Sequence, residues 1–211
     1  MCAEAETIGI AVFARAPVPG EAKTRLIPVL GRAGAASLQR QLTERALATA
    51  CALPRARVTL WVAGDIDDPF IVEAAARHGV AVAAQVGADL GARMHQAFVA
   101  AAGPLLLIGT DCPQLRVDDL DAAAAALASH EVVLQPASDG GYVLIGLRRP
   151  QPTLFDSISW GEPSVLEQTR NRIAAAGLRC AMRPVLDDLD TAADLQCALA
   201  AGLIEPPPCT Q

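Results

Sequence analysis

The sequence predicts one α/β domain in which helices cover both faces of a mostly parallel sheet. Short apolar runs of strand length alternate with longer segments of helix-forming residues over nearly all of the 211 residues. Hydrophobic residues make up 52% of the chain but aromatic residues only 3%, so Ala, Leu and Val supply most of the apolar content. We expect residues 1–204 to form this domain and residues 205–211, which include three prolines, to form a disordered tail.

Two strands and one helix are expected in the first part of the chain. The apolar run at residues 8–12 predicts a buried strand. Residues 33–53 are rich in strong helix formers, with Leu38 and Leu42 on one face, and predict a helix that returns across the sheet. Residues 57–63 then predict the second strand.

The middle of the chain supplies two more helices and two more strands. The turn at residues 65–69 is expected to cap a helix that ends at His78, and residues 80–84 predict a short third strand. Residues 87–94 are expected to open a helix that runs to about residue 102. Residues 104–109 are the most apolar run in the chain, which is typical of a central strand covered on both faces.

The last part of the chain begins with an Ala-rich helix at residues 117–129 and a strand at 131–136. The Asp139-Gly140-Gly141 segment can turn tightly and could return residues 142–147 as an antiparallel strand. The remaining expected elements are a helix that begins with Pro163 and ends near residue 176, a short strand at 180–184, and a final helix after the acidic residues 187–190.

The charge balance and the cysteines narrow the class of protein. A formal net charge of −6 and a pI near 5.0 argue against a general nucleic-acid binder or a protein of anionic membranes. The longest apolar stretch, residues 97–108, is interrupted by Gly103-Pro104 and is too short to span a bilayer. Glu4 and Glu6 do not fit a signal peptide. Six cysteines show neither zinc-ligand spacing nor a disulfide framework. We therefore expect a cytoplasmic protein with small-molecule partners, and leave homodimer formation open.

The first candidate site is the basic segment that follows the first strand, residues 13–26. Two prolines and a glycine exclude a regular strand or helix, so an irregular loop is expected to carry Arg15, Lys23, Thr24 and Arg25. Ligands of open α/β sheets bind at the carboxyl ends of the strands. The loop could be an ordinary solvated turn, but such a concentration of cations in an acidic chain favours phosphate binding.

Carboxylates are expected near the same edge of the sheet. Asp111 follows the most apolar strand and could cap the next helix. A carboxylate that faces bound phosphates, however, needs a divalent cation between them, which favours Mg²⁺ or Mn²⁺ binding. In the acidic run near the C-terminus, Thr191 and Asp194 fit a helix capping box. Capping does not explain Asp188 or Asp190, and either could supply a second carboxylate to the metal.

Two glycine-containing motifs each have a structural and a functional interpretation. The segment Asp139-Gly140-Gly141-Tyr142 is either a tight turn before a strand or a place where backbone amides approach the acceptor substrate. In residues 87–94, Asp89 can cap the following helix and Gly91 can allow close packing. Alternatively, the N-terminus of this helix faces a nucleotide.

Taken together, these motifs resemble a bacterial family of candidate glycosyltransferases, also described as radical-SAM/selenodomain-associated transferases, in the GT-A nucleotide-diphospho-sugar transferase superfamily. The matching segments run in order over nearly the whole chain, at residues 13–20, 23–26, 87–94, 109–113, 139–142, 145–146 and 190–195. The resemblance implies a GT-A fold, a Rossmann-like three-layer sandwich. It also implies that nucleotide binds at the ends of the first strands and that a divalent metal binds Asp111.

Two narrower resemblances bear on the reaction. The first loop is similar to the phosphate-gripping loop of phospholactate guanylyltransferase. The Asp-Thr-x-x-Asp-Leu segment is similar to one in the cytidylyltransferase that activates 3-deoxy-manno-octulosonate, which implies that Asp190 binds metal. Glycosyltransferases of this fold usually carry an Asp-x-Asp metal motif, whereas Pro113 replaces the second Asp here. This departure favours nucleotidyl transfer.

The sequence therefore predicts a metal-dependent transferase that moves a nucleotidyl group from a nucleoside triphosphate to a small phosphorylated acceptor. The alternatives are glycosyl transfer from a nucleotide sugar and a non-catalytic nucleotide-binding protein. The predicted catalytic residues are Arg15, Lys23, Arg25 and Asp111, and the predicted ligands of Mg²⁺ or Mn²⁺ are Asp111 and Asp190. The predicted substrate-binding residues are Ala14, Gly20, Thr24, Gly87, Asp89, Gly91, Asp139, Gly140, Gly141 and Tyr142.

Overall fold

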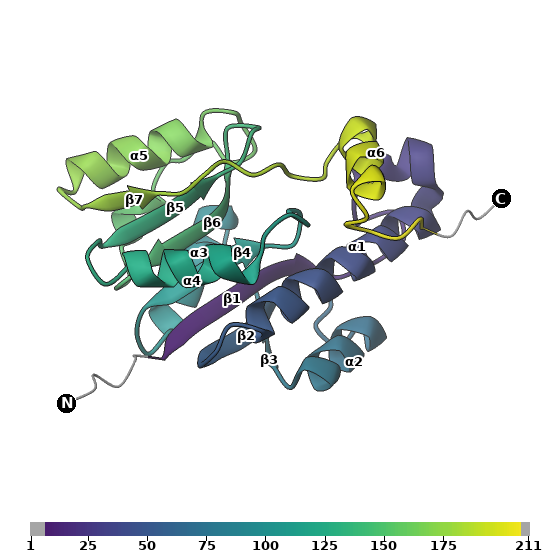
Figure 1. Cartoon of the computed structure of the whole chain (residues 1–211), viewed down its shortest axis with the longest axis horizontal. Coiled ribbons are helices and arrows are strands. Elements are labelled where there is room, and N and C mark those ends of the chain that lie inside the picture. Colours follow the sequence, from purple (N-terminus) through teal and green to yellow (C-terminus); the bar gives the residue numbers. More distant parts are fainter. Residues whose placement is uncertain (1–6, 208–211) are drawn as a thin grey trace.

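The structure, a computed structural model, describes residues 7–207 and is built around one seven-stranded sheet (Figure 1). The strand order is β3-β2-β1-β4-β6-β5-β7. β6 runs antiparallel to both of its neighbours, β4 and β5, and every other neighbouring pair is parallel. The strands are β1 (Ile8–Arg15), β2 (Ala56–Ala63), β3 (Ala81–Ala84), β4 (Leu105–Gly109), β5 (Val132–Pro136), β6 (Tyr142–Leu147) and β7 (Cys180–Met182).

Five of the six α-helices form layers on the two faces of this sheet, and the sequence predicted helices on both faces. The helices are α1 (Ile27–Cys51), α2 (Pro69–His78), α3 (Leu90–Ala100), α4 (Val117–Ala126), α5 (Val165–Ala175) and α6 (Ala192–Ala200). Two short 3₁₀ segments occur at η1 (Thr24–Leu26) and η2 (Pro152–Leu154). Buried side chains of α1, α2 and α4 pack on one face, and those of α3 and α5 pack on the other.

The pleat of the central strand β1 divides its side chains between the two cores. Ile10 and Val12 point towards the core beneath α1, α2 and α4, whereas Ala11 and Phe13 point towards α3 and α5. Ile10 and Val12 are fully buried. Burial of an aliphatic side chain of this size stabilises a fold by about 1.5–3 kcal/mol. A strand buried on both faces is expected to read as an unbroken apolar run, and residues 8–12 do so.

A third, smaller core joins the two ends of the chain. The C-terminal helix α6 lies against the first half of α1, away from the sheet (Figure 1). Apolar side chains of α6 and of the segments on either side of it pack against those of η1 and α1. The buried members of this core are Leu26, Leu38, Leu42, Leu189, Leu195, Ala198 and Ile204. This packing brings residues 189–190 back to the edge of the sheet where β1 ends.

Several boundaries differ from the sequence prediction. β1 extends to Arg15 instead of ending at residue 12, because the parallel ladder with β2 continues as far as the pair Arg15–Ala63. Arg15 is therefore a strand residue and not a loop residue. α1 begins at Ile27, earlier than residue 33, and contains a kink at Gly31, whose φ of 69° and ψ of 170° are not helical.

Residues 205–207, the described part of the expected tail, contact the folded domain. The backbone amide of Glu205 donates a hydrogen bond of 2.9 Å to Oε1 of Gln41, and Pro207 is buried. The rest of the expected tail, residues 208–211, lies outside the described residues, and the domain boundary at residue 204 stays a prediction. Within residues 7–207, no helix combines the length and apolarity that crossing a membrane requires.

Candidate functional site

A cleft of about 750 Å³ opens at the carboxyl ends of the central strands. Its walls come from the last residues of β1 and β2, the residues at and after the end of β4, and the start of β6, which reaches the same edge because it is antiparallel to β4. The charged and polar residues that line it are Arg15, Glu21, Lys23, Thr24, Arg25, Gln39, Gln85, Arg93, Thr110, Asp111, Cys112, Tyr142, Asp188 and Asp190.

Lys23 enters this cleft from the loop after β1. The flanking residues Ala22 and Leu26 are fully buried and anchor the loop. Lys23 itself has a left-handed backbone conformation (φ 46°, ψ 46°), which residues other than glycine rarely adopt. Its side chain is only 6% exposed. Lys23 thus combines an unfavourable backbone conformation with an amine that points inwards instead of into solvent.

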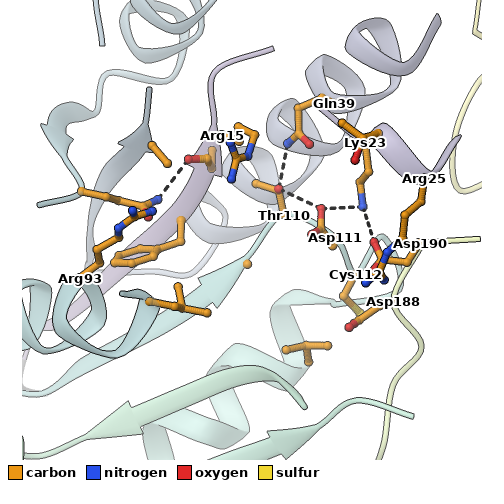
Figure 2. A pocket seen from close by; sticks show the side chains of 18 of the residues that line it. Arg15, Lys23, Arg25, Gln39, Arg93, Thr110, Asp111, Cys112, Asp188 and Asp190 are labelled. Atoms are coloured by element: carbon orange, nitrogen blue, oxygen red, sulfur yellow. Dashed lines mark hydrogen bonds and ion pairs between the residues drawn. The ribbon is translucent and has the colours of Figure 1, made fainter. Parts of the chain in front are cut away.

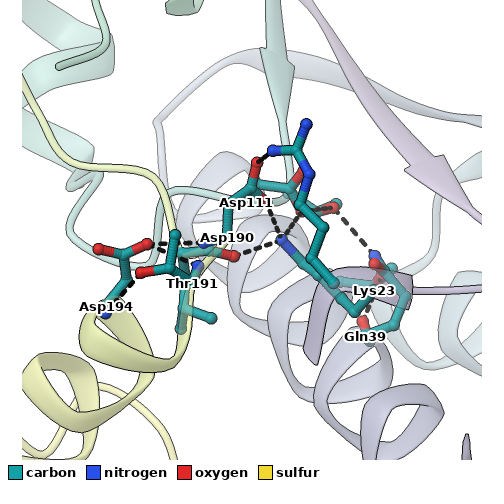
Figure 3. Close-up of polar contacts among 10 residues, drawn as sticks. Lys23, Gln39, Asp111, Asp190, Thr191 and Asp194 are labelled. Atoms are coloured by element: carbon teal, nitrogen blue, oxygen red, sulfur yellow. Dashed lines mark hydrogen bonds and ion pairs between the residues drawn. The ribbon is translucent and has the colours of Figure 1, made fainter. Parts of the chain in front are cut away.

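The Lys23 amine is surrounded by three oxygens. Its Nζ lies 2.8 Å from Oδ1 of Asp111 and 3.1 Å from Oδ1 of Asp190, and it donates a hydrogen bond of 2.6 Å to the carbonyl oxygen of Leu189 (Figures 2 and 3). Burial acts to lower the pKa of Lys23, but the two carboxylates outweigh it, so the pKa is raised above its ordinary value. The amine is a firmly held cation between the two residues that the sequence assigned to a metal.

Asp111 is held at the end of β4 by a buried polar chain. Nε2 of Gln39 donates to Oγ1 of Thr110 at 3.0 Å, and Thr110 Oγ1 donates to Oδ1 of Asp111 at 3.4 Å. Gln39 and Thr110 are 3% and 5% exposed, so Asp111 rests on a desolvated support while half of its own side chain stays exposed. The alternative role of capping the next helix belongs to Asp119, which accepts the Arg116 amide at 3.0 Å.

Asp190 is positioned by the start of α6. Oδ2 of Asp194 accepts the amides of Asp190 (3.1 Å) and Thr191 (2.7 Å), and Oγ1 of Thr191 accepts the Asp194 amide at 3.3 Å (Figure 3). This is the capping box that the sequence predicted. Arg25 Nη1 lies 3.2 Å from Oδ2 of Asp190, but its side chain is 73% exposed, so water screens this pair.

A third carboxylate, Asp188, lines the cleft beside the other two. Burial, together with the negative charges of Asp139, Asp111 and Asp190, raises the pKa of Asp188 to about 7. The sequence left Asp188 and Asp190 as alternatives for the second carboxylate, and the structure brings both to the cleft. Crowding of this kind is expected where a cation is to be bound.

The opposite side of the cleft is cationic. Figure 2 shows Arg15 and Arg93 apart from the carboxylate group, with Asp111 and Lys23 across the opening. Arg93 lies in the first turn of α3, and its Nε donates to the Gly87 carbonyl oxygen at 3.4 Å. The side chain of Gln85 bridges the last residues of β1 and β2, because its Nε2 donates to the carbonyl oxygens of Ala14 (3.1 Å) and Trp61 (3.0 Å).

The residues that the sequence predicted for the site divide into two groups. The cleft is lined by Ala14, Arg15, Lys23, Thr24, Arg25, Asp111, Tyr142 and Asp190. Outside that lining lie Gly20, Gly87, Asp89, Gly91, Asp139, Gly140 and Gly141. Several of the latter have local structural contacts: Asp89 Oδ1 accepts the Ala92 amide (2.8 Å) as a helix cap, and Asp139 Oδ1 accepts the Gly141 amide (2.8 Å) within the turn. Their roles in substrate binding stay predictions.

Gln39, Gln85 and Arg93 were missed by the sequence analysis. Gln39 stands between Leu38 and Leu42 on a helix whose buried face is otherwise largely apolar, and a polar residue at such a position was an available signal. Arg93 occupies the first turn of the helix that Asp89 caps, at the strand edge where ligands of α/β folds bind. Cys112 also lines the cleft, but burial raises the pKa of its thiol to about 12, which makes it a poor nucleophile.

The carboxylates of the cleft bear on whether it can hold a divalent metal. Among residues 7–207, no three His, Cys, Asp or Glu side chains converge closely enough to hold an ion by themselves. Asp111 and Asp190 nevertheless share one cation, the Lys23 ammonium, through one oxygen each, and Asp188 lines the same cleft. Carboxylate oxygens are the ligands that Mg²⁺ and Mn²⁺ prefer. The donor set fits such a metal in type, with the lysine amine in the shared position.

Comparison with known families connects this geometry to other proteins. The family described as "Uncharacterized protein conserved in bacteria (DUF2064)" matches residues 46–162. A candidate nucleotide-diphospho-sugar transferase from Desulfovibrio desulfuricans G20 is 33% identical, with 92% of this chain and 86% of that chain covered and a TM-score of 0.82. No curated protein matches the chain.

More distant structures share the fold. The 4-diphosphocytidyl-2C-methyl-D-erythritol synthase of Anaerococcus prevotii DSM 20548 is 12% identical, with 95% of this chain and 100% of that chain covered and a TM-score of 0.64. Glucosyl-3-phosphoglycerate synthase of Mycobacterium tuberculosis is also 12% identical, with 93% of this chain and 77% of that chain covered and a TM-score of 0.56; that structure is a complex with Mn²⁺, UDP and glucosyl-3-phosphoglycerate. The fold class predicted from the sequence is thereby confirmed.

Proposed function

The chain belongs to the DUF2064 family, and we propose that it is a metal-dependent transferase of the GT-A fold that acts on a nucleotide. Its reaction, in this proposal, is nucleotidyl transfer from a nucleoside triphosphate to a small phosphorylated acceptor. The observation that carries the proposal is the convergence of Asp111 and Asp190 on one cation in a cleft whose other side presents Arg15 and Arg93.

The distribution of charge in the cleft supports a polyphosphate ligand. Arg15, Arg25 and Arg93 line it, and a guanidinium offers a planar fork of donors that matches phosphate oxygens. The chain as a whole carries a net charge of −6, so these cations are a local feature and not part of a basic surface. A triphosphate would lie between the arginines and the carboxylates.

The residues would divide the chemistry as follows. Lys23 and the arginines would hold the phosphates and stabilise the charge that develops as pyrophosphate leaves. Asp111 and Asp190 would hold Mg²⁺ or Mn²⁺, with Asp188 near them, and a metal bound there would neutralise charge on the phosphate oxygens. An acceptor phosphate is already a nucleophilic anion at neutral pH and needs little help from a general base. Tyr142 and Val143, at the start of β6, also line the cleft, and the acceptor would bind beside them.

Glycosyl transfer from a nucleotide sugar is the second candidate. Two structural relatives favour it: the 33% identical protein is a candidate nucleotide-diphospho-sugar transferase, and the M. tuberculosis synthase holds Mn²⁺ and UDP. Pro113 in place of the second Asp of an Asp-x-Asp motif counts against it. A non-catalytic protein would be favoured if the Asp111 and Asp190 side chains lay far apart. Instead, both carboxylates lie within 3.1 Å of the Lys23 amine.

A thermal-shift panel tests the proposal. Nucleoside triphosphates, nucleoside diphosphates and nucleotide sugars are each added with and without Mg²⁺ or Mn²⁺, and Asp111→Ala is the control. A ligand at 100 times its dissociation constant adds about 2.7 kcal/mol to the free energy of unfolding, which is readily measured. We expect a metal-dependent shift with a triphosphate that is lost in the control, followed by pyrophosphate release on turnover. A shift with nucleotide sugars alone, and nucleoside diphosphate as product, would move the assignment to glycosyl transfer.

A further inference from the structure

Lys23 is the only lysine in the chain, which carries its other sixteen basic charges on arginine. The ammonium and guanidinium groups differ in shape. An ammonium is a compact point charge with three donors, whereas a guanidinium is a broad planar fork. The one ammonium of this protein lies where three oxygens converge, so each of its three N–H groups has an acceptor: Asp111 Oδ1, Leu189 O and Asp190 Oδ1.

This environment resembles the coordination shell of a small cation more than an ordinary surface ion pair. The Lys23 side chain is 6% exposed, so little water competes for its donors. Oδ1 of both carboxylates faces the amine, and Oδ2 of Asp190 faces Arg25. A divalent ion that used the same Oδ1 atoms would meet the ammonium at close range, and like charges in such a poorly solvated space repel strongly.

We propose that the Lys23 ammonium occupies the cation position of the Asp111–Asp190 pair until a nucleotide binds, so that the divalent metal is bound together with the nucleotide and not before it. This inference rests on the proposed function, because it takes the carboxylate pair as the metal site. The flexible four-carbon stem of Lys23 lets the amine move from the carboxylates to the phosphates of the nucleotide. The polyphosphate would therefore supply both a new partner for the lysine and additional oxygens for the metal.

The inference makes metal binding in the absence of nucleotide the decisive quantity. The wild-type protein should bind Mn²⁺ alone weakly, since the ammonium already neutralises the carboxylates. Lys23→Met keeps the length of the side chain and removes its charge, which leaves two carboxylates without their cation. The affinity for Mn²⁺ alone should then rise about tenfold or more. Arg57→Met is the matched control: Arg57 is exposed at the start of β2, at the opposite end of that strand from the cleft, so its removal should change the affinity no more than about twofold.

The experiment is a Mn²⁺ titration monitored by electron paramagnetic resonance, with wild type, Lys23→Met and Arg57→Met, each with and without the nucleotide selected by the thermal-shift panel. Tighter binding of Mn²⁺ by Lys23→Met in the absence of nucleotide supports the exchange. Equal or weaker binding overturns it. If wild type binds Mn²⁺ equally with and without nucleotide, the exchange is wrong while the proposed metal dependence stands. If wild type binds no Mn²⁺ with any nucleotide, both proposals fall.

The single lysine allows a second measurement on the unmodified chain. Lysine labelled with ¹³C at Cε gives one side-chain signal from the whole protein, and that signal belongs to Lys23. Millimolar Mg²⁺ alone should leave it in place, and Mg²⁺ with nucleotide should move it as the amine changes partners. A shift caused by Mg²⁺ alone, or no shift with both, would contradict the exchange even if the Lys23→Met variant failed to fold.

Discussion

The backbone amide of Leu189 donates a hydrogen bond of 2.8 Å to the carbonyl oxygen of Asp111. The bond joins the loop after the central strand β4 to the segment that precedes α6. Asp111 and the residue after Leu189, Asp190, therefore present their carboxylates to the same point, which Lys23 Nζ occupies. The geometry of the candidate site depends on this contact between two backbones as well as on the three charged side chains.

Lys23→Ala should reduce the rate of nucleotide turnover by about 10²-fold or more, because it removes a preorganised group that stabilises developing charge. The quantity to measure is kcat/KM for pyrophosphate release with the triphosphate that the thermal-shift panel selects. Arg25→Ala, which removes a more exposed cation from the same loop, should cost less. Unchanged turnover in Lys23→Ala would exclude this lysine from catalysis.

Asp188→Asn should raise stability at alkaline pH and leave it unchanged at acid pH. The folded state raises the pKa of Asp188 from 3.8 to about 7, so it retains a proton that the unfolded chain loses. Stability is therefore lost as pH rises from about 4 to 7, and the full penalty remains above that window. Asp188→Asn removes this charge and should therefore raise the free energy of unfolding by about 1–3 kcal/mol at pH 8.

Chemical denaturation of wild type and Asp188→Asn at pH 4.5 and pH 8 measures this difference. Asp187→Asn is the matched control, since Asp187 is the exposed neighbour of the half-buried Asp188. The same gain at both pH values, or an equal gain in the control, would show that Asp188 is not the group responsible.

Thr191→Ala should destabilise the protein by about 1 kcal/mol, because its Oγ1 accepts the Asp194 amide in the capping box of α6. The same change should weaken the stabilisation by metal and nucleotide, since α6 holds Asp190 in place. Thr153→Ala removes an exposed hydroxyl of η2 that makes no hydrogen bond within residues 7–207, and it should have almost no effect. Equal melting temperatures for the two variants would argue against the cap.

Gly140→Ala should be among the most destabilising small substitutions in the chain. An added Cβ would lie 2.0 Å from the carbonyl oxygen of Pro163, and the φ of 92° is unfavourable for any residue with a side chain. We expect a loss of about 3 kcal/mol or more. Gly177→Ala offers the comparison: its φ of 66° is also positive, but no atom lies within 4 Å of the added carbon, so about 1–2 kcal/mol is expected. Similar unfolding midpoints for the two variants would contradict the steric argument.

Much of the fold could be predicted because it depends on local patterns. An apolar run such as residues 104–109 indicates a central strand wherever it lies, and the Thr191–Asp194 spacing indicates a helix start. The ends of the elements were predicted less accurately. β1, for example, gains three further residues by pairing with β2, and the sequence of either strand by itself does not indicate that pairing. Gln39 was missed for the same reason: its partner Thr110 comes from a distant segment.

By itself, the sequence determined the α/β class, the order of the elements and the chemical groups of the candidate site, because residue periodicity, turn residues and charge act over short distances along the chain. Only the tertiary structure decided how those groups meet. Apolar packing of α6 on α1 returns residues 189–190 to the end of β4, and the left-handed backbone of Lys23 turns its amine inwards. The lysine that the sequence assigned to phosphate thus lies between the two carboxylates assigned to the metal. The physical reason is that a buried ammonium is stable only when anionic groups pair with it.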